Sequence, residues 1–317
     1  MSRQLQLDEH TAGALRLDEA YAACRAIARR EAKNFYYAFV ALPRPKRNAI
    51  CAIYAFMRQA DDLADDESVP IDERRTRLDA WLAEWRAASA GSGPGGATND
   101  AVFLAVRDAT VRFQIPLALL DELVAGVTMD LDSGKYSATD TYATFTDLYR
   151  YCYLVASVVG LVCIRIFGYN DALAEKLAEE TGIAFQLTNI LRDVAEDAER
   201  NRVYLPLDDL KAHGVSLEGL LRRRSGAPPT TAEQALLKGI GQRAEWYYLS
   251  AQALMPLIDK DSRPALWVLV RIYHALLKRI EQAEYDVFSR RASVPLVEKL
   301  TILVVGLGRM AWVRVVG

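Results

Sequence analysis

The 317-residue sequence predicts an all-α protein, and three observations support this fold class. Apolar residues recur every three to four positions along nearly the whole chain, which is the period of an amphipathic helix. No segment shows the strict alternation or the two-residue hairpin turns that paired strands would require. Proline and glycine fall between the periodic segments, where they would end helices. We therefore expect a single all-α domain over residues 1–317, with its helices arranged around a central cavity.

The helices of the first half are separated by residues that stop a helix. Pro43 and Pro45 follow the first, Pro70 follows the second, and a glycine-rich stretch at residues 91–96 follows the third. Pro116 stands at the expected start of the fifth helix. The predicted helices cover residues 17–33, 46–66, 71–88, 98–113 and 116–131.

Proline and glycine also separate the predicted helices in the second half of the chain. Its apolar stretch at residues 151–164 is bracketed by Arg150 and Arg165 and is shorter than the roughly 20 residues that span a bilayer. We therefore predict a buried core helix there. The expected helices cover residues 142–167, 170–200, 230–258, 262–288 and 294–314.

Composition narrows the function classes. Hydrophobic residues at 51%, charged residues at 25% and a net charge of −2 are typical of a soluble globular protein, and no basic block indicates nucleic acid. The four cysteines show no paired spacing and stand among apolar residues, which predicts reduced thiols and a cytoplasmic location. The segment at residues 300–317, interrupted by Arg309 and Arg314, is predicted to pack as a final helix. A weak peripheral contact with a membrane surface is kept as the alternative for this segment.

Two acidic clusters stand out because each lies in an otherwise apolar helix. Each residue advances about 100° around a helix axis, so the polar residues of each cluster share one narrow arc. Both clusters contain an Asp-x-x-x-Asp pair. The first arc, of roughly 60°, carries Tyr54, Arg58, Asp61 and Asp65, and the second, of roughly 80°, carries Gln186, Asn189, Asp193 and Asp197.

Carboxylates in an apolar setting need cations, because burying an unpaired charge is very costly. Oxygen ligands suit Mg²⁺, which takes one or two carboxylates together with substrate phosphates. Two pairs with the same spacing therefore predict Mg²⁺, with Mn²⁺ as an alternative, bound to a diphosphate. The competing interpretation is two solvated acidic helix faces, which one pair alone would favour.

Other polar residues near the clusters are candidates for the same site. Arginine and lysine stabilise the charge of a departing diphosphate, although an exposed salt bridge is the alternative role for each. Tyr151 could present its ring to a cation or serve only as a core aromatic residue. The basic candidates are Lys33, Arg58, Arg192, Arg202 and Arg290.

The two clusters and their surroundings resemble the squalene/phytoene synthase family. The resemblance is carried by the segments at residues 54–65 and 186–197, followed by Arg202-Val203-Tyr204-Leu205-Pro206. It extends from about Tyr21 to Arg291 and implies the isoprenoid synthase fold. The resemblance also implies that the aspartates at 61, 65, 193 and 197 hold Mg²⁺ on prenyl diphosphate substrates.

The resemblance assigns further roles to individual residues. The predicted catalytic residues are Tyr54, Arg58, Tyr151 and Arg192. The predicted substrate-binding residues are Lys33, Asn34, Phe35, Gln186, Asn189, Arg202, Tyr273 and Arg290. Asn34 stands where the family often has a serine. No NADPH is expected, since the chain shows no dinucleotide fingerprint.

The implied reaction is head-to-head (1′-1) condensation of two farnesyl diphosphates through a cyclopropylcarbinyl diphosphate to a squalene-type product. The alternative is condensation of two geranylgeranyl diphosphates to phytoene. A third hypothesis is a non-catalytic helical scaffold or assembly factor, which would not need all four aspartates. The sequence leaves the oligomeric state open.

Overall fold

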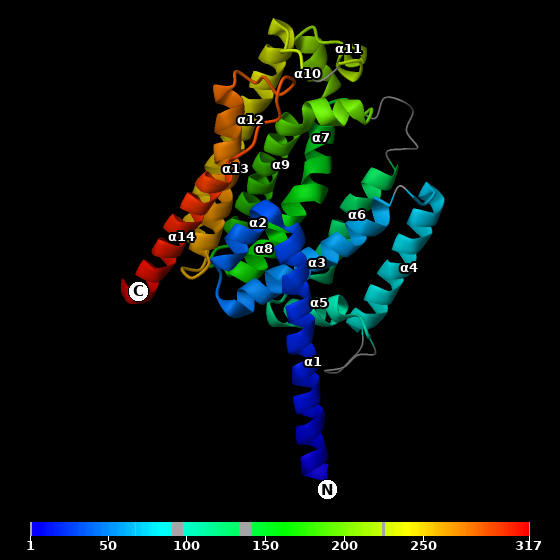
Figure 1. Cartoon of the computed structure of the whole chain (residues 1–317), viewed down its shortest axis with the longest axis vertical. Coiled ribbons are helices and arrows are strands. Elements are labelled where there is room, and N and C mark those ends of the chain that lie inside the picture. The colour runs from blue at the N-terminus through cyan, green and yellow to red at the C-terminus, as the bar shows by residue number, and fades with distance from the viewer. Residues whose placement is uncertain (1, 67, 91–97, 133–140, 224–225, 317) are drawn as a thin grey trace. The chain divides into compact units, whose positions relative to one another are not determined.

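The computed structural model describes the backbone of residues 2–66, 68–90, 98–132, 141–223 and 226–316. Side chains are described within these ranges except for residues 2–15, 33–34, 130–132 and 310–316. The chain divides into two compact units, residues 1–131 and 132–317. Across the described ranges the secondary structure is helical apart from one isolated bridge between Tyr169 and Ile258 (Figure 1). The predicted all-α class is confirmed, and a single domain over the whole chain stays a prediction.

The first unit contains six helices among its described residues. Pro45 occupies the first turn of α3, where its missing N–H and fixed φ are tolerated. The short helix α2 was not predicted, because its eight residues give too few turns for a period to be recognised. The helices are α1 (Ser2–Glu31), α2 (Lys33–Val40), α3 (Arg44–Ala64), α4 (Ile71–Ala90), α5 (Ala101–Arg112) and α6 (Leu117–Asp132), whose last residue opens the second unit.

An aromatic cluster joins α3, α4 and α5. The ring of Phe56 lies 4.7 Å from that of Trp81 and 5.1 Å from that of Trp85, and Trp85 lies 5.6 Å from Phe103. Phe56, Trp85 and Phe103 are among the largest fully buried side chains. Phe56 stands about 200° around α3 from Tyr54. Burial of Phe56 therefore turns the acidic stripe of α3 away from the core of this unit.

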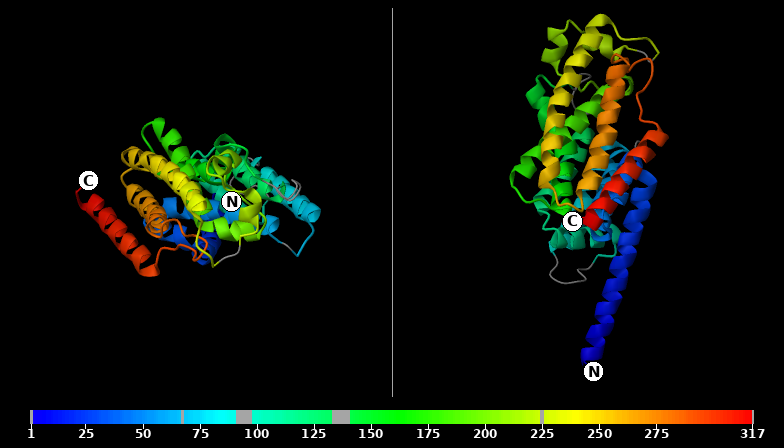
Figure 2. Two further views of the ribbon diagram at one scale, coloured as in Figure 1. Left: turned by 90° about the horizontal axis from the view of Figure 1, so that it is seen from above. Right: turned by 90° about the vertical axis from the view of Figure 1, so that its left-hand side faces the viewer.

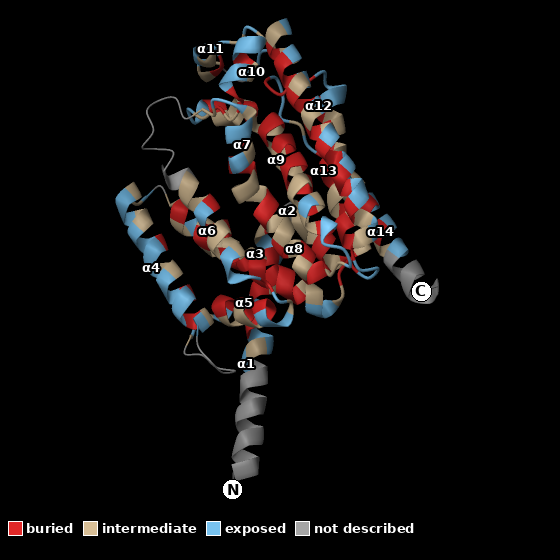
Figure 3. Ribbon diagram, turned by 180° about the vertical axis from the view of Figure 1, so that it is seen from behind, coloured by how far each residue is buried: buried red, intermediate tan, exposed pale blue. Residues whose placement is uncertain are grey.

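The second unit is built around α9 (Leu173–Glu199), with α12 and α13 running alongside it (Figure 2). Core residues of α9 recur at helical spacing, and Figure 3 shows them in red. Thr188 on α9 hydrogen-bonds the hydroxyl of the buried Tyr248 on α12 at 3.0 Å. The other elements are α7 (Phe145–Cys152), a π-helical turn (Tyr153–Ser157), α8 (Val158–Phe167), α10 (Leu207–Ala212), α11 (Leu217–Leu221), α12 (Thr231–Leu254), a 3-10 turn (Met255–Leu257), α13 (Arg263–Gln282) and α14 (Leu296–Val316).

The segment Phe145–Phe167 is, by length and composition, the one candidate for a membrane span among the described residues. Residues along it, including Leu148, Cys152, Val162 and Ile166, are buried within the protein. This supports in part the buried core helix predicted for residues 151–164, since 44% of the most apolar window of the segment is buried. The π-helical turn in its middle could not be read from periodicity, and such turns often occur at functional sites.

Small residues let α9 approach this segment closely. A Cβ atom at Gly182 would stand 2.5 Å from Cα of Ser157, and one at Gly160 would stand 3.0 Å from the carbonyl oxygen of Ala178. The Ser157 hydroxyl donates to the carbonyl of Glu179 at 2.7 Å. The backbone of α9 and the π-helical turn are thus held in direct contact beside the predicted site.

We expect Gly182→Ala to lower the free energy of unfolding by roughly 2–3 kcal/mol, because its methyl group meets backbone atoms that cannot move aside. Urea denaturation measures the loss. Gly239→Ala on α12 is the matched control, since a Cβ there meets only His213 atoms at 3.8 Å and beyond. Alanine is the better helix former, so the control should be stabilised by about 0.5–1 kcal/mol. Equal losses in both variants would contradict the close-contact argument.

Candidate active site

The first acidic stripe lies on the last two turns of α3 within the first unit. Asp61 is half-buried, Asp65 is exposed, and the N–H of Asp65 closes the helix on the carbonyl of Asp61 at 2.8 Å. Arg58 forms an ion pair with Asp62, one turn along the helix, rather than with the predicted ligands. Its Nε atom is buried without a hydrogen-bond partner. The guanidinium is therefore held at the stripe with one donor still available for an anion.

Tyr54 lies on the same face of α3 as Asp61, and the predicted Phe35 lies on α2 of the same unit. Tyr54 is half-buried and its ring meets the edge of Phe39 at 6.2 Å. Burial raises the pKa of Tyr54, opposed by the positive charge of Arg58. The hydroxyl therefore stays protonated and can donate a hydrogen bond. The side chains of Lys33 and Asn34 lie outside the described residues, so their predicted roles stay predictions.

The second stripe follows α9 and is more deeply buried. The side-chain nitrogen of Asn189 donates to Oε1 of Gln186 at 3.3 Å. Tyr273 on α13 is buried, and its ring stacks on Phe185 at 4.5 Å. Burial raises the pKa of Tyr273 to about 12, against the charge of Arg192 and a hydrogen bond with Asn189. The structure therefore brings together Gln186, Asn189 and Tyr273, as the sequence predicts.

Two arginines hold Asp193. Nε of Arg192 donates to Oδ1 at 2.8 Å, and its Nη2 donates to Oδ2. Arg291 donates to Oδ1 from Nε at 3.0 Å and from Nη2 at 2.7 Å, and it also pairs with Glu196 at 3.0 Å. Burial alone would raise the pKa of Asp193, but the two guanidinium groups outweigh it and lower the pKa. Asp193 is therefore an ionised carboxylate.

Asp197 is the contrasting carboxylate of the pair. Burial raises its pKa to about 7, with a further contribution from the negative charge of Asp193 and opposition from Arg202 and Arg200. It stands in the last turn of α9, where the unpaired carbonyl groups also disfavour negative charge. Asp197 therefore lacks a countercharge sufficient to keep it ionised below neutral pH.

The turn after α9 places Arg202 beside this carboxylate. Asn201 adopts a left-handed conformation with φ 58°, which asparagine tolerates better than most residues. The N–H of Arg202 then returns to the carbonyl of Asp197 at 2.8 Å. This local geometry explains why the predicted arginine and the predicted metal ligand lie together.

The residues of the second stripe fit a hard divalent cation. Oδ1 of Asn189 is buried and accepts no hydrogen bond, so it is available as a neutral oxygen ligand. With Asp193 and Asp197 it gives three oxygen donors at successive turns of one helix. Among the described residues, however, no three acidic, histidine or cysteine side chains cluster closely enough to form a metal site by themselves. The set therefore suits a cation that completes its shell with water and phosphate oxygens.

Three tyrosines lie against one another beside Asp197. The ring of Tyr151 stacks on that of Tyr204 at 5.0 Å, and Tyr142 lies 5.5 Å from Tyr151 and 6.3 Å from Tyr204. Tyr204 and Asp197 line the same small cavity of about 10 Å³. Tyr151 was predicted for the site; Tyr142 and Tyr204 were not assigned roles. The position of Tyr204 two residues after Arg202 was the available signal for it.

The neighbouring residues Arg290 and Arg291 differ in the ion pairs that they form with α9. Both side chains are exposed, and Arg291 makes the contacts to Asp193 and Glu196. Glu284 and Tyr285 adopt left-handed conformations, with φ 53° and 61°, and turn the chain at the end of α13. No glycine marks this turn, so the sequence could not show which of two neighbouring arginines returns to α9. Arg291, which was not predicted, contacts the second stripe, and the role of Arg290 stays a prediction.

Comparison with known proteins identifies the family. The model of the squalene/phytoene synthase family matches residues 28–298, which includes both acidic stripes. The chain belongs to the squalene/phytoene synthase family. A 15-cis-phytoene synthase of Synechocystis sp. is 34% identical over 94% of this chain and 86% of its own length. A phytoene synthase of Mycobacterium tuberculosis is 35% identical over 90% of each chain.

Solved structures of the squalene/phytoene synthase family share the fold. A dehydrosqualene synthase in complex with ligand matches with a TM-score of 0.78 and 29% identity, covering 95% of this chain and 99% of the other. Squalene synthase HpnC from Alicyclobacillus acidocaldarius matches with a TM-score of 0.75 and 27% identity, covering 86% and 97%. The predicted isoprenoid synthase fold and prenyltransferase activity are confirmed: the protein condenses prenyl diphosphates head to head.

Proposed function

We propose that this enzyme is a phytoene synthase, which condenses two molecules of geranylgeranyl diphosphate. The observation that carries the proposal is the similarity over nine-tenths or more of the chain to curated relatives named phytoene synthase. This favours the C20 alternative over the condensation of two farnesyl diphosphates that the sequence first suggested. Two solved relatives carry the names dehydrosqualene synthase and squalene synthase, so the C15 reaction remains the second candidate.

The carboxylate and amide side chains of the two stripes are the proposed metal ligands. Asn189, Asp193 and Asp197 of the second unit would hold Mg²⁺, and Asp61 and Asp65 of the first unit are proposed as metal ligands in the same way. Mg²⁺, when bound, supplies positive charge that stabilises the departing diphosphate. All five side chains present oxygen atoms, which are the ligands that Mg²⁺ prefers.

The arginines would bind the diphosphate oxygens directly. Arg192 and Arg291 present planar, always charged donor groups, which match phosphate oxygens in pairs. Both donate hydrogen bonds to Asp193, so a diphosphate would compete with that carboxylate for their N–H groups. Arg58, with its unpaired Nε, and Arg202 are the further donors.

The tyrosine stack would shield the reacting carbons. Loss of diphosphate leaves an allylic cation, which the double bond of the second substrate attacks; proton loss then gives a cyclopropylcarbinyl diphosphate. A second ionisation releases the remaining diphosphate, the cyclopropylcarbinyl cation rearranges to a linear cation, and loss of a further proton gives the neutral linear product. The faces of Tyr151 and Tyr204 can stabilise such cations by about 0.5–2 kcal/mol each while excluding water.

Product analysis tests the proposal. The purified protein is incubated with Mg²⁺ and either C15 or C20 diphosphate, and the extracted products are analysed by mass spectrometry. We expect a C40 hydrocarbon from the C20 substrate, and inhibition of any C15 reaction by added C20 diphosphate. A C30 product or presqualene alcohol from C15 diphosphate, with no C40 product from C20, would assign the enzyme to the second candidate. No product from either would favour a non-catalytic scaffold.

A further inference from the structure

The outward face of α14 is more apolar than a helix face surrounded by water would normally be. The side chains that emerge on this face are aliphatic, and Val297 and Val304 are 76% and 66% exposed. The one side-chain hydroxyl among them, on Thr301, is satisfied by the carbonyl of Val297 at 2.9 Å. We call this face the α14 ridge; it consists of Leu296, Val297, Leu300, Thr301, Val304 and Val305.

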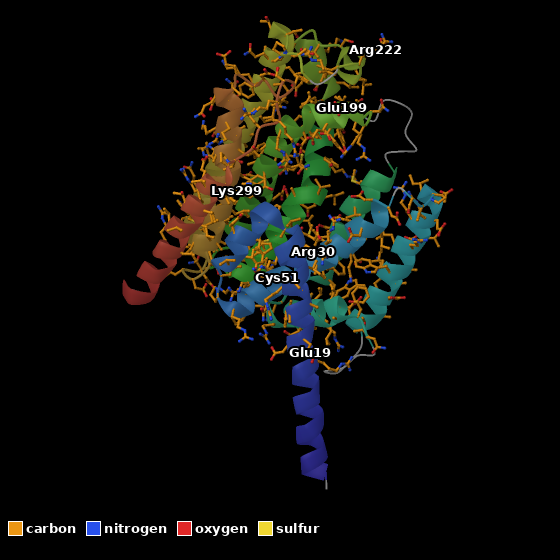
Figure 4. All side chains as sticks on the ribbon, viewed as in Figure 1. Glu19, Arg30, Cys51, Glu199, Arg222 and Lys299 are labelled. Atoms are coloured by element: carbon orange, nitrogen blue, oxygen red, sulfur yellow. The ribbon has the colours of Figure 1, made fainter. Side chains whose placement is uncertain are left out.

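Among the described side chains of α14, the acidic residue and the lysine lie off the ridge. Glu298 forms an ion pair with Arg279 on α13. Lys299, labelled in Figure 4, has its pKa lowered by burial and by the charge of Arg192. A Cβ at Gly306 would stand 2.3 Å from Cγ2 of Val268, so the inward face is in tight contact with α13. The exposed ridge is therefore not the result of a loosely placed helix.

A groove adjoins the ridge, and Arg309 in its lining and Arg271 beside it both lie over the ring of Trp267. It has a volume of about 520 Å³ and lies between α13 and α14, with Pro264, Trp267, Val305 and Arg309 among the residues that line it. The guanidinium carbon of Arg309 lies 4.3 Å from the centre of the Trp267 ring, and that of Arg271 lies 5.9 Å from it. Neither arginine forms an ion pair with any described residue. Among the described residues that line the groove, none is acidic.

We propose that the α14 ridge and the adjoining groove form a docking surface for a membrane that contains anionic phospholipid. Aliphatic side chains on one helix face, next to cationic residues, are what an interfacial helix uses to enter the headgroup region. Tryptophan is favoured at that depth because one end of its ring is apolar and the other donates a hydrogen bond. Arg271 and Arg309 would meet the phosphates.

Charge favours this occupant over a second copy of the chain. A symmetric dimer through this surface would bring the same patch against itself. No carboxylate is found among the described side chains of the ridge and the groove lining, so two copies lack electrostatic complementarity for the two arginines. A phosphate-rich lipid surface supplies the missing negative charge.

Vesicle flotation with the full chain tests the proposal. One set of vesicles is phosphatidylcholine alone, and the other is phosphatidylcholine and phosphatidylglycerol in equal parts. We expect binding to the second set. The double variant Val297→Asp/Val304→Asp should lower the partition coefficient at least tenfold, and Arg271→Gln/Arg309→Gln should lower it about tenfold or more, at about 1 kcal/mol for each charge.

Val111→Asp is the matched control, because Val111 on α5 is 75% exposed and lies far along the chain from α14. It should bind as the unaltered protein does, and circular dichroism and thermal melting should show every variant folded. The proposal is overturned by no vesicle binding, by equal binding to both vesicle sets, or by equal losses in the control. It is likewise overturned if light scattering shows a dimer that Val304→Asp dissociates without any vesicle binding. The assay contains no prenyl substrate, so its outcome is independent of the proposed function.

Discussion

Asp197→Asn should abolish condensation and, at the same time, make the metal-free protein more stable at pH 8. The loss of activity follows from removing a charged oxygen at the proposed metal site, where the loss of one such interaction lowers turnover by at least about 10²–10³-fold. The gain in stability follows from the raised pKa of Asp197, about 7 in the folded protein. An ordinary loss of structure would instead lower activity and stability together.

The pH dependence gives the sign of this effect. A carboxyl group with a raised pKa in the folded state favours folding below its ordinary pKa near 4. That contribution is lost as pH rises through about 7, because the folded protein must then bury a charge. Asparagine stays neutral throughout. The variant should therefore match the original protein near pH 4 and exceed it by roughly 2–4 kcal/mol at pH 8.

Chemical denaturation in EDTA at several pH values measures the difference. The control is Glu218→Gln, which removes one partner of an exposed ion pair and should change stability by less than about 1 kcal/mol at any pH. Added Mg²⁺ should stabilise the original protein more than the Asp197 variant. If the variant were less stable than the original protein at pH 8, the ionised Asp197 would have to stabilise the fold, which would contradict its raised pKa.

Asp193→Asn should show the opposite behaviour in stability with the same loss of activity. Its pKa is lowered by Arg192 and Arg291 against the effect of burial, so the ionised carboxylate stabilises the fold above pH 4. The substitution removes the negative charge that Arg192 and Arg291 share and leaves only a neutral amide oxygen as acceptor, so we expect a deficit of about 1–3 kcal/mol at pH 7. That deficit should shrink as pH falls through the lowered pKa. The same denaturation series measures it.

The sequence predicts long helices well because their period is repeated many times. Helix α9 was expected over residues 170–200 and spans Leu173–Glu199. The short helices α10 and α11 were missed, since five or six residues contain less than two turns. Helix α13 ends at Gln282, before the expected residue 288, because Glu284 and Tyr285 turn the chain in left-handed conformations. The sequence did not predict this end because no glycine stands at the turn.

The site was predictable where it depends on spacing along one helix and not where it depends on the return of a distant segment. Spacing alone placed Gln186, Asn189 and the two aspartates of α9 on one stripe, as the structure has them. The residue pattern along α9 could not show that Arg291 hydrogen-bonds Asp193, because the two residues are 98 positions apart in the sequence. Nor could it show that one aspartate of the pair is charge-compensated and the other is not, because that difference comes from tertiary contacts.

Arg291→Ala should lower kcat/KM by about 10²-fold, while Arg290→Ala should change it less than about threefold. Both variants remove one arginine from the same loop, so they are matched in charge and position. Both side chains are exposed, and of the two it is Arg291 that forms ion pairs with Asp193 and Glu196. Steady-state kinetics with the active prenyl diphosphate measures the pair. Equal losses would restore the sequence-based choice of Arg290.

Arg291→Lys separates charge from geometry at this position. Lysine keeps the positive charge but cannot donate two parallel hydrogen bonds to a phosphate or carboxylate. If Arg291 acts on the diphosphate through its planar fork, the lysine variant should recover less than about a tenth of the lost kcat/KM. Competition by inorganic pyrophosphate gives a second readout, and its inhibition constant should rise in the alanine variant. A variant with unchanged pyrophosphate inhibition but reduced thermal stability would assign Arg291 a role only in holding the loop to α9.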